Sequence, residues 1–201
     1  MRKARIAVLV SGGGTNLQAL LDAERAGSIP SGEIVLVISS KPGVFALERA
    51  ERAGVASVVC SRKDSPSQDA FEDAILAALA GAKADLVVLA GFLSILGPRV
   101  IAAYPDRIIN VHPSLIPSFC GAGFYGLRVH EAALSYGVRV TGATVHLVNE
   151  IPDGGRILLQ KAVEIRDGDT PETLQRRVME EAEWKLLPEA CELMAKSLTN
   201  E

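Results

Sequence analysis

The sequence predicts an α/β fold built on a doubly wound, mostly parallel sheet, with an antiparallel strand pair in the C-terminal part. Strand-like and helix-like segments alternate through the first half of the chain, which is the pattern of a parallel sheet with right-handed crossovers. Residues 86–90 are wholly apolar, as expected of a strand that helices cover on both faces. After Gly137 the pattern changes to alternating apolar positions, which predicts paired strands.

Apolar periodicity, glycines and prolines place the elements in order along the chain. Strands are predicted at 5–10, 34–38, 57–59, 86–90 and 108–112. Helices are predicted over 17–21, 45–53, 65–79, in the segment after Pro98, and over 127–136. The strand pair lies at 138–140 with 143–147 and at 157–165, joined through a turn at 153–155. A final helix of about 171–196 begins after Thr170, which is a suitable capping residue.

The composition fits a single domain that spans residues 1–201. A chain with 48% apolar residues can bury a full core, and no long polar linker divides it. No segment reaches the roughly 18 apolar residues of a membrane helix, and the first strand follows directly after residue 3, so we expect a cytoplasmic protein. The net charge of −3 disfavours a general nucleic-acid or membrane surface, because those partners require concentrated positive charge.

The glycine-rich turn at residues 11–16 predicts a phosphate site. It joins a buried strand to an amphipathic helix, where bare glycines let backbone N–H groups close on an anion and the helix adds unpaired donors. Leu17 stands where the dinucleotide fingerprint requires glycine, the second strand does not end in Asp or Glu, and no Gly-Lys-Ser/Thr follows. Neither a nicotinamide enzyme nor a P-loop protein is therefore expected. A tight turn that binds no ligand is the alternative.

Residues 108–117 carry the chemistry that we expect. Three apolar β-branched residues form a short buried strand, and Pro113 favours an extended His112, so the strand should end there. Side chains alternate along a strand, which places Asn110 and His112 on one face, about 6.6 Å apart at roughly 3.3 Å per residue. The ligand crevice of an open parallel sheet lies beyond the carboxyl ends of its strands, where this pair is found. The alternative is a capped strand end with a hydrogen-bonded core asparagine.

Two loops are expected beside this crevice. Residues 91–96 leave the fourth strand and lead to the helix whose first turn accepts Pro98, so their backbone should form a wall of the site. Residues 118–126 contain three glycines and the adjacent aromatic residues Phe124 and Tyr125, which is unusual between a strand and a helix. Loops beside a site commonly carry function.

The cysteines and the remaining histidines give weaker evidence of a functional role. Cys60, Cys120 and Cys191 are odd in number and lack a C-x-x-C spacing, which indicates reduced thiols and predicts no zinc site. Among them only Cys120, near the expected site, merits a nucleophile hypothesis. His130 and His146 lie on a predicted helix and strand without a motif, so we interpret both as structural. No metal is expected.

Four segments together resemble the phosphoribosylglycinamide formyltransferases, within the wider family of folate-dependent formyltransferases. They are Ser-Gly-Gly-Gly-Thr-Asn-Leu-Gln-Ala-Leu at 11–20, Val-Leu-Ala-Gly-Phe-Leu-Ser-Ile-Leu at 88–96, Asn-Val-His-Pro-Ser-Leu-Ile-Pro at 110–117 and Asp-Gly-Gly at 153–155. The likeness spans nearly the whole chain, and the first segment is its most selective part. It implies a formyltransferase-like, Rossmann-type fold. It also implies transfer of the formyl group of 10-formyltetrahydrofolate to the primary amine of 5′-phosphoribosylglycinamide in purine synthesis.

The resemblance also assigns roles to residues, with Asn110, His112 and Asp153 as the catalytic set. Asn110 and a protonated His112 would stabilise the oxyanion that forms when the amine attacks, while Asp153 would keep His112 protonated and help to remove the amine proton. Without the resemblance, Asp153 would be interpreted as part of an ordinary Asp-Gly turn. The same matching assigns phosphate binding to Gly13, Gly14, Thr15 and Asn16, glycinamide or ribose binding to Glu183, and folate binding to Phe92, Leu93, Ser94, Ile95 and Leu96.

The chain departs from the family pattern at three places. Trp184 follows Glu183 where the family usually has histidine, and Ser94 replaces an arginine found in some relatives. Residues 118–121 replace a more usual proline-containing run. These differences concern the ligand contacts and the 118–126 loop.

Other functions share part of this pattern. Formyltetrahydrofolate hydrolase, the main alternative, would use the same three residues with water, but it normally carries an N-terminal regulatory domain, and here the first strand starts by residue 5. A methionyl-tRNA formyltransferase would need a C-terminal domain and a basic RNA surface. A non-catalytic phosphate- or nucleotide-binding module would not need Asn110, His112 and Asp153 together. We therefore expect small-molecule substrates, in a monomer or homodimer.

Overall fold

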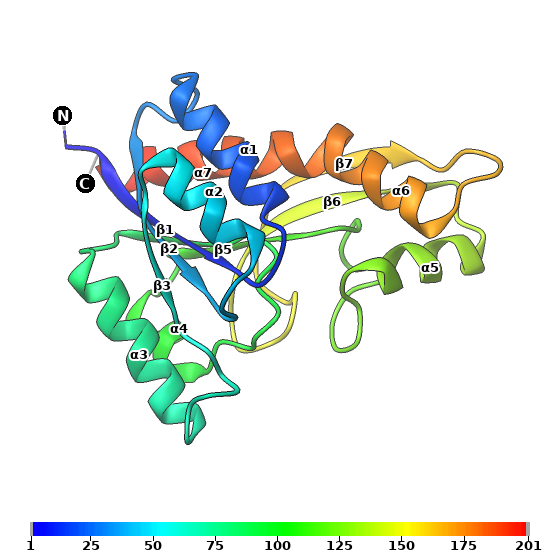
Figure 1. Ribbon diagram of the computed structural model, residues 1–201. Helices are drawn as coiled ribbons and strands as arrows, with labels where there is room; N and C mark the ends of the chain where they lie inside the picture. Colours follow the sequence, from blue (N-terminus) through cyan, green and yellow to red (C-terminus); the bar gives the residue numbers. More distant parts are fainter. Residues whose placement is uncertain (1, 200–201) are drawn as a thin grey trace.

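Seven strands form one mixed sheet in the computed structural model, which describes residues 2–199. The strand order is β3-β2-β1-β4-β5-β6-β7 (Figure 1). Strands β1 to β5 pair in parallel, whereas β6 runs antiparallel to β5, and β7 runs antiparallel to β6. The predicted fold class is therefore confirmed. Residues 1, 200 and 201 of the predicted domain lie outside the described range.

The elements follow the predicted order. The strands are β1 Ala4–Val10, β2 Gly32–Ser39, β3 Ala56–Val59, β4 Leu86–Leu89, β5 Ile108–His112, β6 Val140–Leu147 and β7 Ile157–Glu164. The helices are α1 Thr15–Arg25, α2 Phe45–Ala53, α3 Gln68–Gly81, α4 Pro98–Ala103, α5 Leu127–Tyr136, α6 Pro171–Val178, the π-helical segment η1 Met179–Glu183, and α7 Trp184–Thr199. Within residues 2–199, no helix combines the length and the apolar character that a membrane crossing requires.

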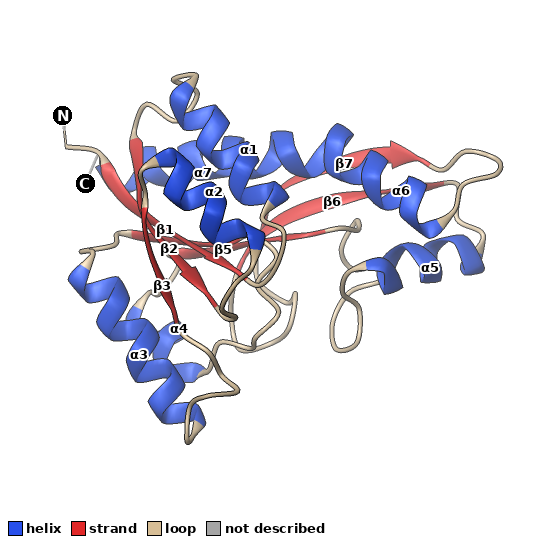
Figure 2. Ribbon diagram, in the orientation of Figure 1, coloured by secondary structure: helices blue, strands red, loops and turns tan. Residues whose placement is uncertain are grey.

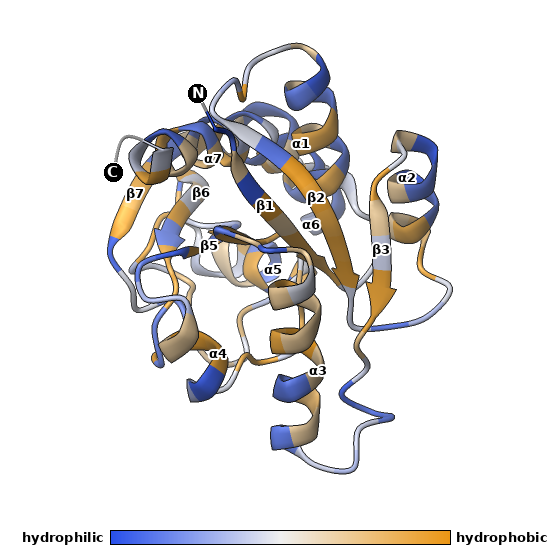
Figure 3. Ribbon diagram, turned by 90° about the vertical axis from the view of Figure 1, so that its left-hand side faces the viewer, coloured by the Kyte–Doolittle hydropathy of each residue, from blue (hydrophilic) through white to orange (hydrophobic). Residues whose placement is uncertain are grey.

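Helices cover both faces of the sheet, because successive residues of the central strands are buried on opposite sides. Ile6 and Val8 of β1 belong to a core that includes α1, α2 and α7, whereas Ala7 and Leu9 belong to a core with α3 and α4. Figure 2 shows α3 and α4 on the opposite side of the central strands from α1 and α2. Most of β2 is orange in Figure 3, as expected of a strand between two helical layers.

One predicted element is wrong in detail. The single final helix expected over 171–196 is divided, because η1 inserts a π-helical turn between α6 and α7. A π turn accommodates an extra residue and changes which side chains face the sheet. Here the turn ends at Glu183, which is buried against the start of α1. The other boundaries lie within a few residues of the predictions, and α2 and α5 agree with them completely.

Candidate active site

The carboxyl ends of β1, β4 and β5 lie at one edge of the sheet, because these strands are adjacent and parallel. The loops that follow them are therefore neighbours. We call residues 11–16, after β1, the glycine loop. A hydrogen bond from the Leu93 N–H to Ser11 Oγ, 2.8 Å long, joins the glycine loop to the loop after β4. The segments that the sequence singled out thus meet at this edge, as predicted.

Asn110, His112 and Asp153 come together, although Asp153 belongs to the segment between β6 and β7. The Asp153 carboxylate lies between two imidazole rings, with Oδ2 3.4 Å from His112 Nδ1 and Oδ1 3.5 Å from His146 Nε2. Asn110 Nδ2 lies 3.1 Å from His146 Nε2. These four side chains form a connected set, which we call the polar cluster.

His146 is the member of the polar cluster that sequence reasoning missed, since we interpreted it as structural. The antiparallel register of β5 and β6 pairs Asn110 directly with His146, and directly opposed residues have side chains within contact distance. His146 Nδ1 lies 2.8 Å from the carbonyl oxygen of Leu147 and donates to it, while Nε2 faces the Asn110 amide, whose nitrogen can only donate. The available signal was a histidine in the mostly apolar run 143–147, and it is informative only when the register is known.

The loop of residues 118–126 orients two members of the polar cluster. The Phe119 carbonyl accepts a hydrogen bond from His112 Nε2 at 2.9 Å, and the Gly121 N–H donates to Asp153 Oδ2 at 2.8 Å. Gly121 has a φ of 87°, in the left-handed region that favours glycine. Asp153 has a φ of 55°, which aspartate adopts more readily than most residues. This unusual loop therefore holds His112 and Asp153 in fixed positions.

The pKa values of the polar cluster correct one expectation. Burial lowers the pKa of His112 below its ordinary 6.5, and it outweighs the Phe119 carbonyl and the Asp153 carboxylate, which both favour the charged ring. Burial raises the pKa of Asp153, but the His146 ring beside Oδ1, the hydrogen bond from the Gly121 N–H and the nearby His112 bring it below the ordinary 3.8. Asp153 is therefore ionised at neutral pH. It does not hold the pKa of His112 above the ordinary value, because desolvation of the ring dominates.

A largely apolar cavity of about 600 Å³ adjoins the polar cluster. Asn110, His146 and Asp153 contribute to its lining, and so do residues 121–125. Leu93 and Ile95, also in the lining, expose 57% and 79% of their surface, and exposed apolar groups of this size often mark a binding surface. The volume is that of a typical small-molecule site. All five residues predicted to bind folate line this cavity, namely Phe92, Leu93, Ser94, Ile95 and Leu96.

The glycine loop presents unpaired N–H groups at the start of α1. Within residues 2–199, the N–H groups of Gly12, Gly13 and Gly14 donate no hydrogen bond. A Cβ atom at Gly13 would meet no atom within 4 Å, so open space faces this residue. Gly14 has a φ of 73°, and a Cβ there would lie 2.7 Å from the Cβ of Ala46. These features suit the predicted binding of an anion.

Glu183 meets the glycine loop from the C-terminal segment. The Asn16 amide donates a 2.6 Å hydrogen bond to Glu183 Oε2 in a buried position. Burial raises the pKa of Glu183 to about 7, although this hydrogen bond opposes the shift. Thr15 Oγ1 lies 3.7 Å from the sulfur of Met179 in η1. The η1 segment thus brings Glu183 to the residues that the sequence predicted for phosphate binding.

Known proteins are similar to this chain in sequence and in fold. Residues 4–191 match the model of a family described as formyl transferase. The chain belongs to the formyl transferase family. Two solved structures are similar to this formyl transferase. A glycinamide ribonucleotide transformylase from Symbiobacterium toebii is 44% identical with a TM-score of 0.90, covering 97% of this chain and 89% of that chain. A phosphoribosylglycinamide formyltransferase from Brucella melitensis is 46% identical with a TM-score of 0.87, covering 96% of each chain.

Two curated relatives differ in how much of their length this formyl transferase covers. Phosphoribosylglycinamide formyltransferase from Haemophilus influenzae is 40% identical over 184 residues, which are 92% of this chain and 84% of the relative. The human trifunctional purine biosynthetic protein adenosine-3 is 45% identical over 194 residues, or 96% of this chain. This chain spans 18% of that trifunctional relative's length. The resemblance stated from the sequence is confirmed.

Two other residues that the sequence analysis considered, Cys120 and His130, lie outside the polar cluster of this formyl transferase. Burial and then the charge of Asp153 raise the pKa of the Cys120 thiol, which disfavours the thiolate that a nucleophile requires. His130 is fully buried on α5, where burial lowers its pKa to about 4. In the described part of the chain, no group of three or more His, Cys, Asp or Glu side chains is arranged to hold a metal ion.

Proposed function

We propose that this formyl transferase transfers the formyl group of 10-formyltetrahydrofolate to the primary amine of 5′-phosphoribosylglycinamide. The products would be formylglycinamide ribonucleotide and tetrahydrofolate, in purine biosynthesis. The observation that carries the proposal is the presence of two different binding features at one edge of the sheet. The glycine loop suits a phosphate, and the apolar cavity beside the polar cluster suits a flat pterin ring. The relatives named phosphoribosylglycinamide formyltransferase support the same reaction.

The glycine loop and Glu183 would bind the phosphorylated amine. Backbone N–H groups from Gly13 to Asn16 point from a helix start, where the unpaired donors and the helix dipole favour a phosphate. Glu183 Oε2 accepts from Asn16, which leaves Oε1 available to accept from a ribose hydroxyl or the glycinamide. Burial keeps this carboxyl group close to its titration point near neutral pH.

The folate co-substrate, which supplies the formyl carbon, would occupy the apolar cavity. Residues 92–96 offer exposed apolar side chains and backbone groups there, while Ser94 offers a hydroxyl where some relatives have arginine. Recognition of the pterin would therefore depend on apolar contact and on backbone hydrogen bonds more than on a charged side chain. The polar wall of the same cavity contains Asn110 and Asp153, which would place the reacting group beside them.

The polar cluster would perform the chemistry. Asn110 Nδ2 has two N–H groups, and since one donates to His146, the other is available for the charge that develops on the formyl oxygen. Asp153 is ionised and would accept the proton that the amine loses, and the folate nitrogen that leaves the formyl carbon would gain a proton in return. His112 donates to Phe119 through Nε2 and directs Nδ1 toward Asp153, so a proton on Nδ1 would add positive charge beside the reacting oxygen.

Formyltetrahydrofolate hydrolase would need no phosphate site for an amine substrate, and the names of the relatives support amine formylation instead.

We also propose that residues 1–201 form one catalytic domain. The protein would act as a monomer or homodimer in the cytoplasm, without nucleic-acid or membrane partners, in keeping with its net charge of −3.

A transfer assay with a matched control tests the reaction. The purified protein is mixed with 10-formyltetrahydrofolate, with and without 5′-phosphoribosylglycinamide, and both products are measured by mass spectrometry. We expect tetrahydrofolate and the formylated amine in equal amounts, and little tetrahydrofolate without the amine. Equal release of tetrahydrofolate in both samples would indicate a hydrolase instead. No reaction in either sample would favour the non-catalytic binding module.

A further inference from the structure

Helix α2 holds the glycine loop from outside the substrate site. Arg49 Nε donates a 2.8 Å hydrogen bond to the carbonyl oxygen of Gly13, and Arg49 Nη1 donates one of 2.8 Å to the side-chain oxygen of Gln18 on α1. The guanidinium carbon lies 4.7 Å from the centre of the Phe45 ring, which supports it from one face. One half-buried arginine therefore links α2, the glycine loop and α1.

Because the peptide bond is planar, the contact of Arg49 with the Gly13 carbonyl also sets the direction of the next N–H group. In a trans peptide, the carbonyl oxygen of one residue and the N–H of the next point in opposite directions. Because Arg49 fixes the Gly13 carbonyl toward α2, the Gly14 N–H must point away from α2. The Ala46 N–H holds the Gly12 carbonyl in the same way, at 3.2 Å, and so directs the Gly13 N–H. Two donors of the loop are thus aimed by contacts with α2.

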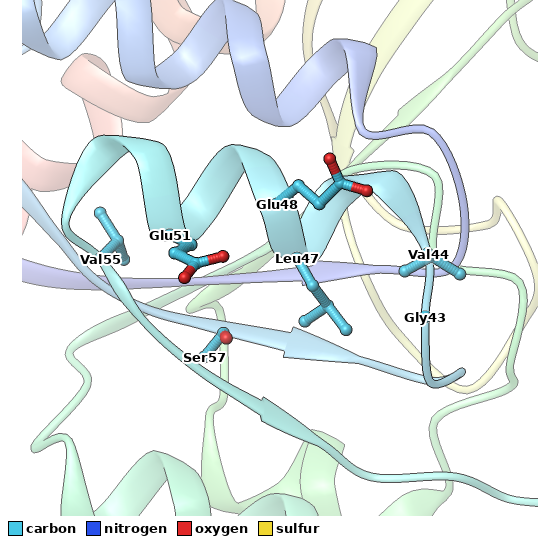
Figure 4. A pocket seen from close by; sticks show the side chains of 7 residues that line it. All are labelled: Gly43, Val44, Leu47, Glu48, Glu51, Val55 and Ser57. Carbon is cyan, nitrogen blue, oxygen red and sulfur yellow. The ribbon is translucent and has the colours of Figure 1, made fainter.

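Charge distinguishes Arg49 from its neighbour on the same helix. In the described chain Arg49 makes no ion pair with a carboxylate, whereas Arg52 pairs with Glu48 at 3.2 Å. The hollow on the other side of α2, next to β3, is lined by Glu48 and Glu51 and is unsuited to an anion (Figure 4). Arg49 therefore brings to the glycine loop a positive charge that no carboxylate of the described chain neutralises.

We propose that Arg49 is a positioning residue for phosphate recognition. It aims the Gly14 N–H at the substrate phosphate and contributes positive charge to the loop, without a part in the transfer step. Arginine suits this task because its planar fork reaches two acceptors at once, here on two different elements. The inference rests on the proposed function, since it assumes that the glycine loop binds the phosphate.

The test compares Arg49→Met with the matched control Arg52→Met. Both arginines lie on α2 and pack on Phe45, but only Arg49 contacts the glycine loop. For Arg49→Met we expect KM for 5′-phosphoribosylglycinamide to rise about tenfold, the scale of a lost charge-assisted hydrogen bond. We expect kcat and KM for the folate to change less than about twofold, because the polar cluster is untouched. Arg52→Met should match the wild type in all three constants.

Two further measurements separate the possible failures. If Arg49→Met fails to fold, Arg49→Lys replaces it, and its ammonium group should raise the same KM by a smaller factor because it lacks the fork. The inference is wrong if the folded Arg49 variant matches Arg52→Met in every constant, or if kcat alone falls. Calorimetric binding of inorganic phosphate needs no transfer reaction. Weaker phosphate binding in the Arg49 variant would support Arg49 even if the wild type failed to formylate the amine, whereas equal binding would contradict it.

Discussion

Replacement of Asp153 by asparagine removes a charge with little change of shape. The carboxylate accepts a 2.8 Å hydrogen bond from the Gly121 N–H, and an amide oxygen can accept the same bond. Asparagine also tolerates the φ of 55° found at this position. We therefore expect the Asp153→Asn variant to fold normally and to bind both ligands, while its chemistry suffers.

The size of the loss follows from the distances within the polar cluster. A carboxylate 3.4 Å from an imidazolium is stabilised on the order of 5 kcal/mol at an effective dielectric constant of about 20. If about half of this is lost at the barrier, turnover falls by about a hundredfold, or about 2.7 kcal/mol. That is the lower end of what a general acid or base contributes.

The same variant should shift the titration of His112 in a defined direction. The carboxylate favours the charged ring, so its removal lowers the pKa of His112 further below the ordinary 6.5. If the charged ring assists transfer, the rate decreases as the pH rises through this pKa, and the decrease moves to lower pH in the variant.

Single-turnover transfer against pH and nitrogen NMR of the imidazole rings measure the two effects on the same samples. Near-normal turnover in a folded variant would remove Asp153 from the mechanism. An unchanged His112 titration would rule out the coupling between the two side chains.

Three further substitutions test other parts of the site. Gly13→Val should weaken binding of the phosphorylated amine far more than binding of folate in calorimetry, because its Cβ meets no protein atom within 4 Å but would obstruct an anion; equal losses would mean a purely structural loop. His112→Phe should keep ligand binding and lower single-turnover transfer by roughly 10²–10³, and a normal rate would contradict its role. Glu183 has a pKa raised from 4.5 to about 7, so the folded state binds more protons and stability falls as the pH rises between these values. Thermal unfolding at about pH 5 and about pH 8 should therefore show a smaller loss of Tm in Glu183→Gln than in the wild type, and equal losses would contradict the raised pKa.

Local patterns in the sequence were sufficient to predict most of the helices and strands. The apolar run at 86–90 and the helical spacing at 45–53 depend on near neighbours in the chain, so their elements could be predicted without the tertiary structure. Asn110 and His112 were found in the same way, because alternation along a strand and the proline after it are local rules. Strand ends at the carboxyl edge of a parallel sheet then indicated the site.

The features that the sequence did not reveal depend on contacts between distant segments. His146 joins the polar cluster through the register of β6 against β5, and no pattern within β6 specifies that register. The lowered pKa of His112 arises from burial, which is a property of the packed molecule. The π turn at η1 interrupts a helical pattern that looks continuous in the sequence, and it brings Glu183 to Asn16.

The antiparallel direction of β6 explains why the polar cluster can assemble at all. A further parallel strand would require a crossover that returns the chain to the opposite end of the sheet before the strand begins. Because β6 instead runs back along β5, its end at Leu147 lies opposite Ile109 near the start of β5, and the Val148 N–H donates to the Ile108 carbonyl. The segment between β6 and β7 therefore returns past Asn110, and it carries Asp153 between the two imidazole rings. The switch from parallel to antiparallel pairing thus supplies the polar cluster with both His146 and Asp153.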